Sequence, residues 1–277
     1  MIYYTYPGFR NKALTISYDD GLWSDVHLLE ILNRYGIRGT FNLNSGCMTE
    51  ERRIGKEKIP ALYKGHEIAT HGVKHLTLAR CPMTDVVKEI LEDRQALEEL
   101  TGEIVCGHAY PNGSYSPEIK TLLPSLGIHY ARIATDTGLY THPQDFYEWN
   151  PTCHHNNRLM YHAKEFLSFD LPRFQYLFYV WGHSYEFDRD NNWYVIEEFC
   201  KMIGGREDIW YATNAEVCHY LMAVKQVHTS VDEKLLFNGS GQDIYLIRNG
   251  ENILLHPGEL QRIHSPESHG KLRKIVL

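Results

Sequence analysis

Hydrophobic positions in the first hundred residues alternate between short runs and longer periodic segments. Short apolar or β-branched runs predict strands at residues 13–17, 39–43 and 65–70. Between them, apolar residues recur every three or four positions and predict two helices, one with its apolar positions at residues 26–32 and one at residues 84–100. Gly36 marks the end of the first helix. The chain therefore begins as an alternation of strands and helices.

The same alternation continues to about residue 212. Further strands are expected at residues 104–106, 128–131, 174–180 and 209–212, and helices from about residue 116 and at residues 191–203. Strands that alternate with helices predict an α/β fold with a parallel sheet and right-handed crossovers. The functional residues of such a fold are expected at the carboxyl ends of its strands.

From about residue 229 the pattern changes to short β-leaning runs separated by turns. These runs lie at residues 235–237, 244–247 and 253–255, and Asn-Gly and Pro-Gly pairs separate them. We therefore divide the chain into an α/β region at residues 1–228 and a small all-β appendage at residues 229–277. A unit of about 50 residues buries too little surface to be stable alone, so it is expected to pack on the α/β region and to be structural.

Composition and charge narrow the classes of partner. The chain has 277 residues and a net charge of −7, and its densest basic stretches are only residues 52–53 and 271–274, so nucleic acid is not an expected partner. The first residues lack a basic stretch followed by an apolar run, and no segment approaches the roughly 18 apolar residues that span a membrane. Six cysteines without a CxxC pair favour reduced thiols. We expect a cytoplasmic protein without a membrane partner.

Two adjacent carboxylates follow the first predicted strand. Asp19 and Asp20 stand where this strand ends, directly before Gly21. At the exit from a strand both side chains can converge on one site, so that one carboxylate binds a metal and the other remains free as a base. Taken alone, such a pair is more often a turn that caps the next helix.

Two histidines follow the third predicted strand. His71 and His75 are four residues apart, a spacing that on a helical turn places both imidazoles on one side. Together with Asp20 they form a set of two histidines and one carboxylate, which suits zinc and leaves positions for water and substrate. An isolated pair of histidines is more often unrelated to metal. The position of both motifs at strand ends favours the metal site.

Three motifs give the chain a specific resemblance. The stretches SYDDG, GHEIATHGVKH and WGHS, in this order, resemble motifs of the polysaccharide deacetylase superfamily, carbohydrate esterase family 4. The resemblance extends over roughly residues 10 to 222. It implies a distorted (β/α) barrel with fewer than eight full repeats. It also implies that Asp20, His71 and His75 bind the metal, that Asp19 is the general base and that His183 is the general acid.

The activity implied by the resemblance is hydrolysis of an N-acetyl group on an amino sugar or an oligo- or polysaccharide. One divalent metal ion, with zinc favoured, would activate water, Asp19 would take its proton and His183 would protonate the departing amine. Two alternatives remain open: a non-catalytic carbohydrate-binding protein on the same barrel, and an amide hydrolase for a small non-sugar substrate. The presence of both Asp19 and His183 favours an enzyme.

One motif departs from the family pattern. Ala109 stands where the family has an arginine that orients the base, and Asn112 stands where it has an aromatic residue. The backbone N–H of Asn112 remains a candidate oxyanion donor, because a backbone donor does not depend on the side chain. We assign Tyr110, Pro111, Asn112 and Trp181 to substrate and oxyanion binding.

Two further residues are candidates to replace the missing arginine. Arg132 and Asp136 lie on or just after the next predicted strand. A carboxylate in residues 185–188 is a candidate to orient His183, although a solvated loop is equally compatible with this run. The loop at residues 149–155 is expected to shape the pocket or simply to pack.

Overall fold

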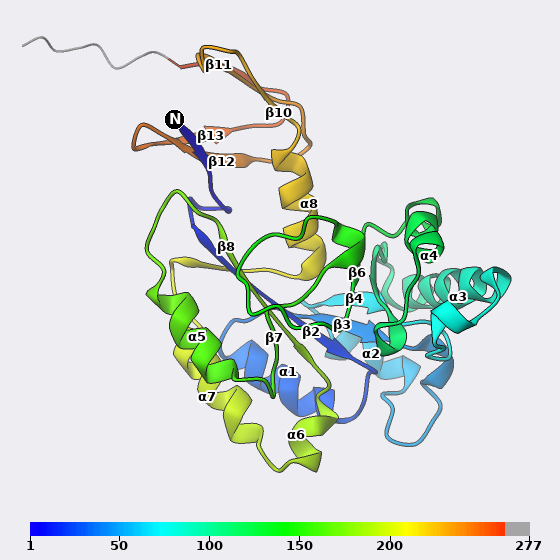
Figure 1. The fold of residues 1–277 in the computed structure, drawn as a ribbon. Helices are drawn as coiled ribbons and strands as arrows, with labels where there is room; N and C mark the ends of the chain where they lie inside the picture. Colours follow the sequence, from blue (N-terminus) through cyan, green and yellow to red (C-terminus); the bar gives the residue numbers. More distant parts are fainter. Residues whose placement is uncertain (264–277) are drawn as a thin grey trace, which may run out of the picture.

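The computed structural model describes residues 1–263 and contains a curled parallel sheet (Figure 1). Its strands follow the order β6-β5-β4-β3-β2-β8-β7, and β9 pairs with the first residues of β2. All of these pairings are parallel. The bounds are β2 (Lys12–Asp19), β3 (Thr40–Leu43), β4 (Glu67–Thr70), β5 (Gly107–Ala109), β6 (Tyr130–Arg132), β7 (Cys153–His154), β8 (Tyr176–Gly182) and β9 (Ile209–Tyr211). The sheet is a distorted (β/α) barrel, as the resemblance implies, and it is parallel, as the pattern of strands and helices predicts.

Helices connect the strands and cover the outside of the sheet (Figure 1). They are α1 (Ser24–Arg34), α2 (Ile59–Leu62), α3 (Met83–Thr101), α4 (Pro117–Leu122), α5 (Leu159–Ser168), α6 (Tyr185–Arg189), α7 (Trp193–Ile203) and α8 (Asn214–Val224). Short 3₁₀ turns lie at Ser45–Cys47, Lys56–Lys58, Leu78–Arg80, Pro111–Gly113, Leu123–Leu126 and Phe146–Glu148. Within residues 1–263, no helix has both the length and the apolar character to cross a bilayer.

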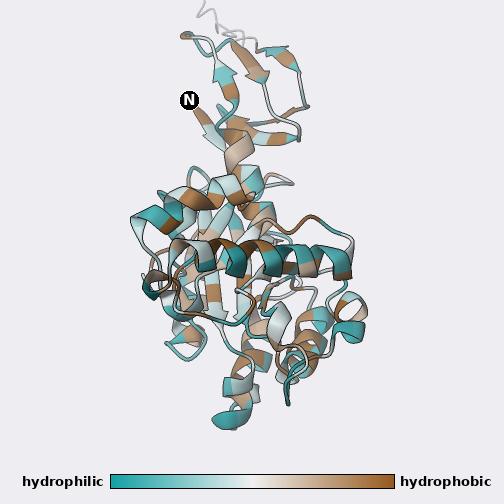
Figure 2. Cartoon of the chain, turned by 90° about the vertical axis from the view of Figure 1, so that its right-hand side faces the viewer, coloured by the Kyte–Doolittle hydropathy of each residue, from teal (hydrophilic) through white to brown (hydrophobic). Residues whose placement is uncertain are grey.

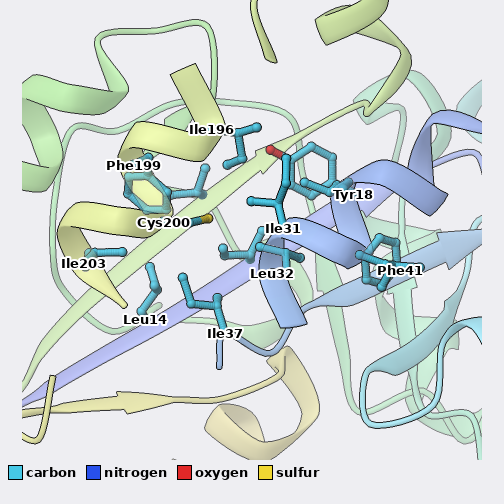
Figure 3. Close-up of a cluster of buried hydrophobic side chains, with 14 of the residues drawn as sticks. Leu14, Tyr18, Ile31, Leu32, Ile37, Phe41, Ile196, Phe199, Cys200 and Ile203 are labelled. Carbon is cyan, nitrogen blue, oxygen red and sulfur yellow. The ribbon is translucent and has the colours of Figure 1, made fainter. Parts of the chain in front are cut away.

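The central strand β2 separates an apolar core from a polar interior. Its residues Leu14, Ile16 and Tyr18 pack with residues of α1 and α7 in the largest hydrophobic cluster (Figure 3). Side chains alternate along a strand, so Thr15, Ser17 and Asp19 point to the opposite face, the inside of the barrel. There, Thr15 donates a hydrogen bond to the Asn214 side chain at 2.7 Å. Asp19 is therefore placed at the end of a polar row inside the barrel.

One predicted strand is wrong, and its cause is local. The run at residues 104–106 is apolar, but the strand lies one step later, at Gly107–Ala109. Ile104 is 81% exposed, whereas Gly107 packs so closely that an added Cβ would lie 2.2 Å from the Tyr130 hydroxyl oxygen. The strand contains Gly107 and Ala109, which carry little β signal. The other predicted strands and helices are confirmed within a few residues of their ends.

The last strands form two small antiparallel sheets beyond α8 (Figures 1 and 2). One has the order β10-β11-β14 and the other the order β1-β12-β13. The bounds are β1 (Ile2–Tyr4), β10 (Val227–Thr229), β11 (Leu235–Asn238), β12 (Ile244–Arg248), β13 (Glu251–Leu255) and β14 (Leu260–Arg262). The three predicted β-runs are confirmed, and β1 joins them from the start of the chain. The last part of the predicted appendage, residues 264–277, lies outside the described residues.

These sheets share a hydrophobic cluster with the barrel. Leu246 and Leu255 are fully buried in the cluster that contains Tyr6 and Tyr220. The Tyr220 hydroxyl donates a hydrogen bond to the Thr5 backbone oxygen at 2.6 Å. The C-terminal strands therefore contribute to the stability of the first strand and of α8.

Leu246→Ala is expected to lower the free energy of unfolding by about 2–5 kcal/mol, because it leaves a cavity in this shared cluster. Phe237→Ala is the matched control in the same region, since Phe237 is 38% exposed and should cost much less. Denaturant unfolding of both variants makes the comparison. Equal stability of the two variants would contradict a shared core.

Candidate active site

Asp19 and Asp20 reach the same end of the barrel through a change of backbone direction. Asp19 is the last residue of β2 and is 3% exposed. Asp20 has a φ of 83° and donates its backbone N–H to the Asn42 backbone oxygen at 2.9 Å. This left-handed conformation turns the chain directly after the strand, so the two carboxylates do not diverge as they would within it.

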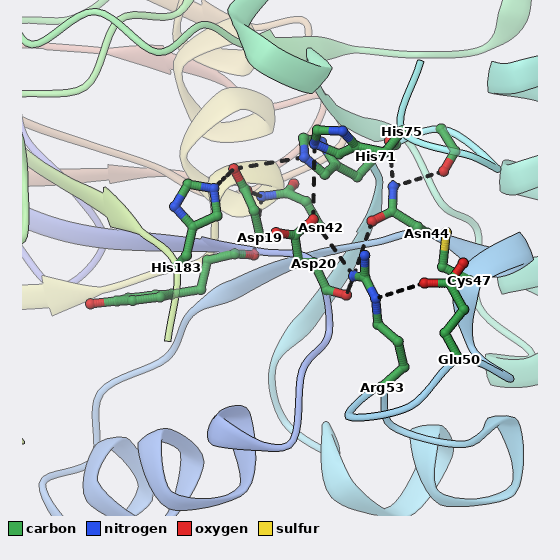
Figure 4. A network of polar contacts seen from close by, with 12 residues as sticks. Asp19, Asp20, Asn42, Asn44, Cys47, Glu50, Arg53, His71, His75 and His183 are labelled. Atoms are coloured by element: carbon green, nitrogen blue, oxygen red, sulfur yellow. Dashed lines mark hydrogen bonds and ion pairs between the residues drawn. The ribbon is translucent and has the colours of Figure 1, made fainter. Parts of the chain in front are cut away.

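His71 and His75 lie in a loop after β4, and the expected helical turn is wrong. Gly72 and His75 have φ angles of 76° and 56°, which coil the loop tightly instead. The Asn44 amide donates to the backbone oxygens of His71 and Gly72 at 2.7 and 2.9 Å. The Asp93 carboxylate accepts the His71 N–H at 3.0 Å. Side chains from two other segments thus fix the loop, and both imidazoles still face one side (Figure 4).

The side chains of Asp20, His71 and His75 fit a divalent cation. Their candidate donor atoms all lie within 4.8 Å of one another. His75 Nε2 is 3.9 Å from Asp20 Oδ1. His71 Nδ1 lies 2.8 Å from the Ala109 backbone oxygen, an acceptor, so this nitrogen carries the proton. The lone pair of His71 is then on Nε2, the nitrogen nearer the carboxylates, as a metal ligand requires.

Asp19 is surrounded by groups that stabilise its charge. The Asn42 amide donates to Oδ1 at 2.8 Å, and the Arg132 guanidinium donates to Oδ2. His71 Nε2 and His183 Nε2 lie 3.9 and 3.8 Å from Oδ2 (Figure 4). Burial alone would raise the pKa of Asp19, but Arg132 and the histidines lower it to about 2. Asp19 is thus a buried carboxylate that stays ionised at neutral pH.

Arg132, one of the two candidates to replace the missing arginine, contacts Asp19 directly. It is 1% exposed, ends β6 and reaches Asp19 at the end of β2, although β5, β4 and β3 separate these two strands in the sheet. Its guanidinium carbon stands 4.6 Å from the centre of the Trp181 ring. Asp136, the other candidate, accepts the Trp181 indole N–H at 2.7 Å and so supports this stack. Both residues belong to the site, and Arg132 makes the contact to the carboxylate.

His183 follows β8 and lies between two carboxylates. Its Nε2 faces Asp19, and its Nδ1 is 3.9 Å from Glu186 Oε1. Burial would lower the pKa of His183, but the Glu186 and Asp19 carboxylates together raise it. Glu186 Oε2 in turn lies 3.0 and 3.2 Å from the Nε2 atoms of His154 and His155. The loop at residues 149–155 therefore reaches the site through Glu186.

The loop at residues 110–113 borders the metal-ligand loop. Tyr110 is buried, and its hydroxyl donates a hydrogen bond to the Tyr147 backbone oxygen at 3.0 Å. Asn112 is exposed, with a φ of 57°, and its amide donates to Thr77 Oγ1 at 3.1 Å. A Cβ at Gly72 would lie 3.7 Å from the Pro111 ring. Pro111 thus contacts the turn between the two predicted histidine ligands, whereas the Tyr110 side chain points into the core.

Sequence reasoning missed several residues that hold this site. Asn42 lies beside Asp19 and donates a hydrogen bond to it. The sequence feature that could have identified Asn42 is a polar amide within an otherwise apolar strand. Arg53 donates to the Asp20 backbone oxygen and lies 3.6 Å from its carboxylate. No pattern in the sequence identified Arg53, because it comes from an irregular loop.

The chain is similar to known proteins in sequence and in fold. Residues 7–131 match the family model of polysaccharide deacetylase. A proposed polysaccharide deacetylase from Mycobacterium smegmatis has 18% identity and a TM-score of 0.61, covering 80% of this chain and 94% of that one. Puue allantoinase has 17% identity and a TM-score of 0.58, covering 77% and 91%. A family 4 carbohydrate esterase from Streptomyces lividans, in complex with acetate, has 15% identity and a TM-score of 0.51, covering 73% and 93%. These structural likenesses establish the fold.

Proposed function

We propose that this protein is a metal-dependent hydrolase that removes N-acetyl groups from an amino sugar or a saccharide containing one, and the match of residues 7–131 to the polysaccharide deacetylase family model supports this. The observation that carries the proposal is the position of Asp19. Its buried, ionised carboxylate stands beside the donor set of Asp20, His71 and His75 without belonging to it. A binding protein has no use for a second carboxylate held in this way.

We assign the metal to Asp20, His71 and His75. A divalent ion such as zinc would supply a Lewis acid for the acetyl oxygen and lower the pKa of a bound water. The residues themselves fix the donors: Ala109 holds the His71 imidazole, and Asn44 holds the loop that carries it.

Asp19 is proposed as the base. At neutral pH its carboxylate is ionised, since its pKa is held to about 2, and Oδ2 is available to take a proton from water. Arg132 and Asn42 fix both oxygens in place, so the carboxylate does not have to reorganise during proton transfer.

His183 is proposed as the acid. The raised pKa of its imidazole favours the protonated form near neutral pH, and its Nε2 faces the same space as Asp19 Oδ2. Protonation of the departing amine prevents the intermediate from expelling water again. Glu186, close to His183 Nδ1, would keep the ring oriented with Nε2 toward the substrate.

The surroundings of the site support a saccharide as substrate. A pocket of about 670 Å³ is lined by residues that follow Asp20 and His183 closely in the sequence, Leu22, Trp23, Ser24, Tyr185, Asp188 and Arg189, and by Arg52. Trp23 is 49% exposed, with Lys58 Nζ 4.0 Å from its ring centre, and the exposed part of an aromatic ring suits the apolar face of a sugar. We assign the binding of the substrate's acetyl group to Pro111, the Asn112 backbone N–H, Trp181 and the Tyr110 backbone. The C-terminal strands carry none of these residues, and we propose that they are accessory.

Incubation with N-acetylglucosamine and its short oligomers tests the proposal. We expect free acetate and an equal amount of free amine. Binding of the oligomers without acetate release would favour the non-catalytic alternative. Hydrolysis of small non-sugar amides with no action on any of the sugars would favour the second alternative.

Arg132→Ala is expected to lower the rate and to shift its pH dependence. Arg132 lowers the pKa of Asp19, so its removal raises that pKa, and the base is protonated at a higher pH than in the native protein. The acid side of the rate profile should therefore move to higher pH. Rates measured from about pH 4 to 9 with unchanged metal content would establish this.

The matched control is Arg34→Ala, an exposed arginine paired with Glu197 on the protein surface. It should leave the pH profile unchanged. A lower rate in Arg132→Ala with the profile of the native protein would mean that Arg132 only supports the fold.

A further inference from the structure

Three donor side chains meet at the end of the barrel opposite to Asp19. Cys106 directly precedes β5, His129 directly precedes β6, and His219 lies on α8. The carboxyl ends of the strands carry the candidate active site. Cys106 and His129 stand at the amino ends of their strands and therefore at the other end of the sheet. The cluster shares no residue with the site described above.

The donor atoms are close enough to share one ion. Cys106 Sγ lies 3.8 Å from His219 Nε2, and His129 Nδ1 lies 2.8 Å from the same nitrogen. All three donor atoms lie within 4.8 Å of one another. In a tetrahedral zinc site two nitrogens lie about 3.3 Å apart, and a sulfur and a nitrogen about 3.5 Å apart. The two distances to His219 Nε2 differ from these values by about 0.5 Å or less.

A small cavity gives access to the cluster. A pocket of about 200 Å³ is lined by Cys106 and His219, and the carboxylate residues Glu67 and Glu103 line it as well. His129 is exposed on the outer side, whereas Cys106 is 6% exposed. A cation therefore has a route from solvent, and a water has room to complete the coordination.

We propose that Cys106, His129 and His219 form a second metal site for a thiophilic divalent cation such as zinc. Binding forms a metal–sulfur bond and two metal–nitrogen bonds, and the thiol proton passes to solvent. The proton that one histidine shares with the other in their hydrogen bond moves to the second nitrogen of its own ring, so that both donor nitrogens present a lone pair. The alternative is that only a hydrogen bond joins His129 and His219. A shared cation also accounts for the buried Cys106 thiol, which lies 3.8 Å from the same His219 nitrogen.

The site would join parts of the fold that are far apart in sequence. It links the starts of β5 and β6 to α8, and the His219 backbone oxygen accepts a hydrogen bond from the Gln242 amide at 3.0 Å. Gln242 lies between β11 and β12. A bound ion would therefore stabilise the contact between the barrel and the C-terminal strands.

Cobalt titration of the metal-stripped protein tests the proposal. Only this site offers a thiol among its proposed ligands, so the cobalt–thiolate charge-transfer absorption reports it separately from Asp20, His71 and His75. We expect this absorption in the native protein and in His71→Ala, and its loss in Cys106→Ser. Cys218→Ser is the matched control, because Cys218 is a buried thiol next to His219 outside the donor set. It should retain the absorption.

His129→Gln keeps the test valid if Cys106→Ser fails to fold, since His129 is exposed. It should bind cobalt more weakly at this site, with unchanged circular dichroism. Absence of the thiolate absorption in the native protein at saturating cobalt, or its persistence in Cys106→Ser, would overturn the proposal. The result does not depend on catalysis, so it stands apart from the proposed hydrolase activity.

Discussion

Asp19→Asn is expected to lower the rate of acetate release by about 10²–10⁴-fold while the protein still binds metal. The amide has nearly the shape of the carboxylate but cannot take a proton from water. The proposed metal ligands Asp20, His71 and His75 remain, so metal content should be unchanged. Steady-state rates and metal analysis of the same samples provide the measurement.

The control for Asp19→Asn is Asp85→Asn, which changes an exposed carboxylate in the first turn of α3. It should keep the native rate. If Asp19→Asn were equally active, the base would have to be another group, and the low pKa of Asp19 would reflect only its contact with Arg132.

His71→Ala is expected to abolish both metal binding at the active site and acetate release. His71 is buried and its Nδ1 is fixed by the Ala109 backbone oxygen, so its Nε2 is a pre-oriented donor that an alanine cannot supply. The measurement is best made in a Cys106→Ser background, where the second proposed site does not contribute. Metal content should then fall from about one ion per chain to none.

His27→Ala is the matched control for His71→Ala, because His27 is a surface histidine on α1. It should retain metal and activity. Full metal content in the His71→Ala protein would show that His71 is not a ligand.

The fold followed from the sequence where each element has a strong apolar face. The strand β2 and the helix α1 carry buried residues at the expected spacing, and both are found as predicted. The helix α5 was missed although Leu159, Ala163 and Phe166 are its buried residues and follow a helical spacing. Its N-cap residue is Arg158, which makes no side-chain capping hydrogen bond, so the sequence carries no signal for the start of this helix.

The candidate site followed from the sequence only for residues in motifs. Asp19, Asp20, His71, His75 and His183 were each identified beside a strand end, and the structure brings them together. The backbone of the histidine loop was not predictable from spacing, since its shape depends on positive φ angles.

Arg132 and Asp136 were the two candidates to replace the missing arginine. Only the three-dimensional arrangement of the barrel shows that Arg132 is the one in contact with Asp19. Its contact with Asp19 joins positions 113 residues apart. The contacts of His154 and His155 with Glu186 also join residues that are distant in the sequence. They depend on the pairing of β7 with β8, which places the two segments side by side. Such contacts depend on the order of strands in the sheet, which periodicity does not encode.

Metal-dependent acetate release is the central claim, and one measurement tests it most directly. The Cys106→Ser protein is stripped with a chelator and incubated with an N-acetylglucosamine oligomer before and after one equivalent of zinc is added. The account predicts no acetate above background before addition and steady release afterwards. Release that is already complete without metal, or no release from any N-acetylated substrate with metal bound, would contradict it.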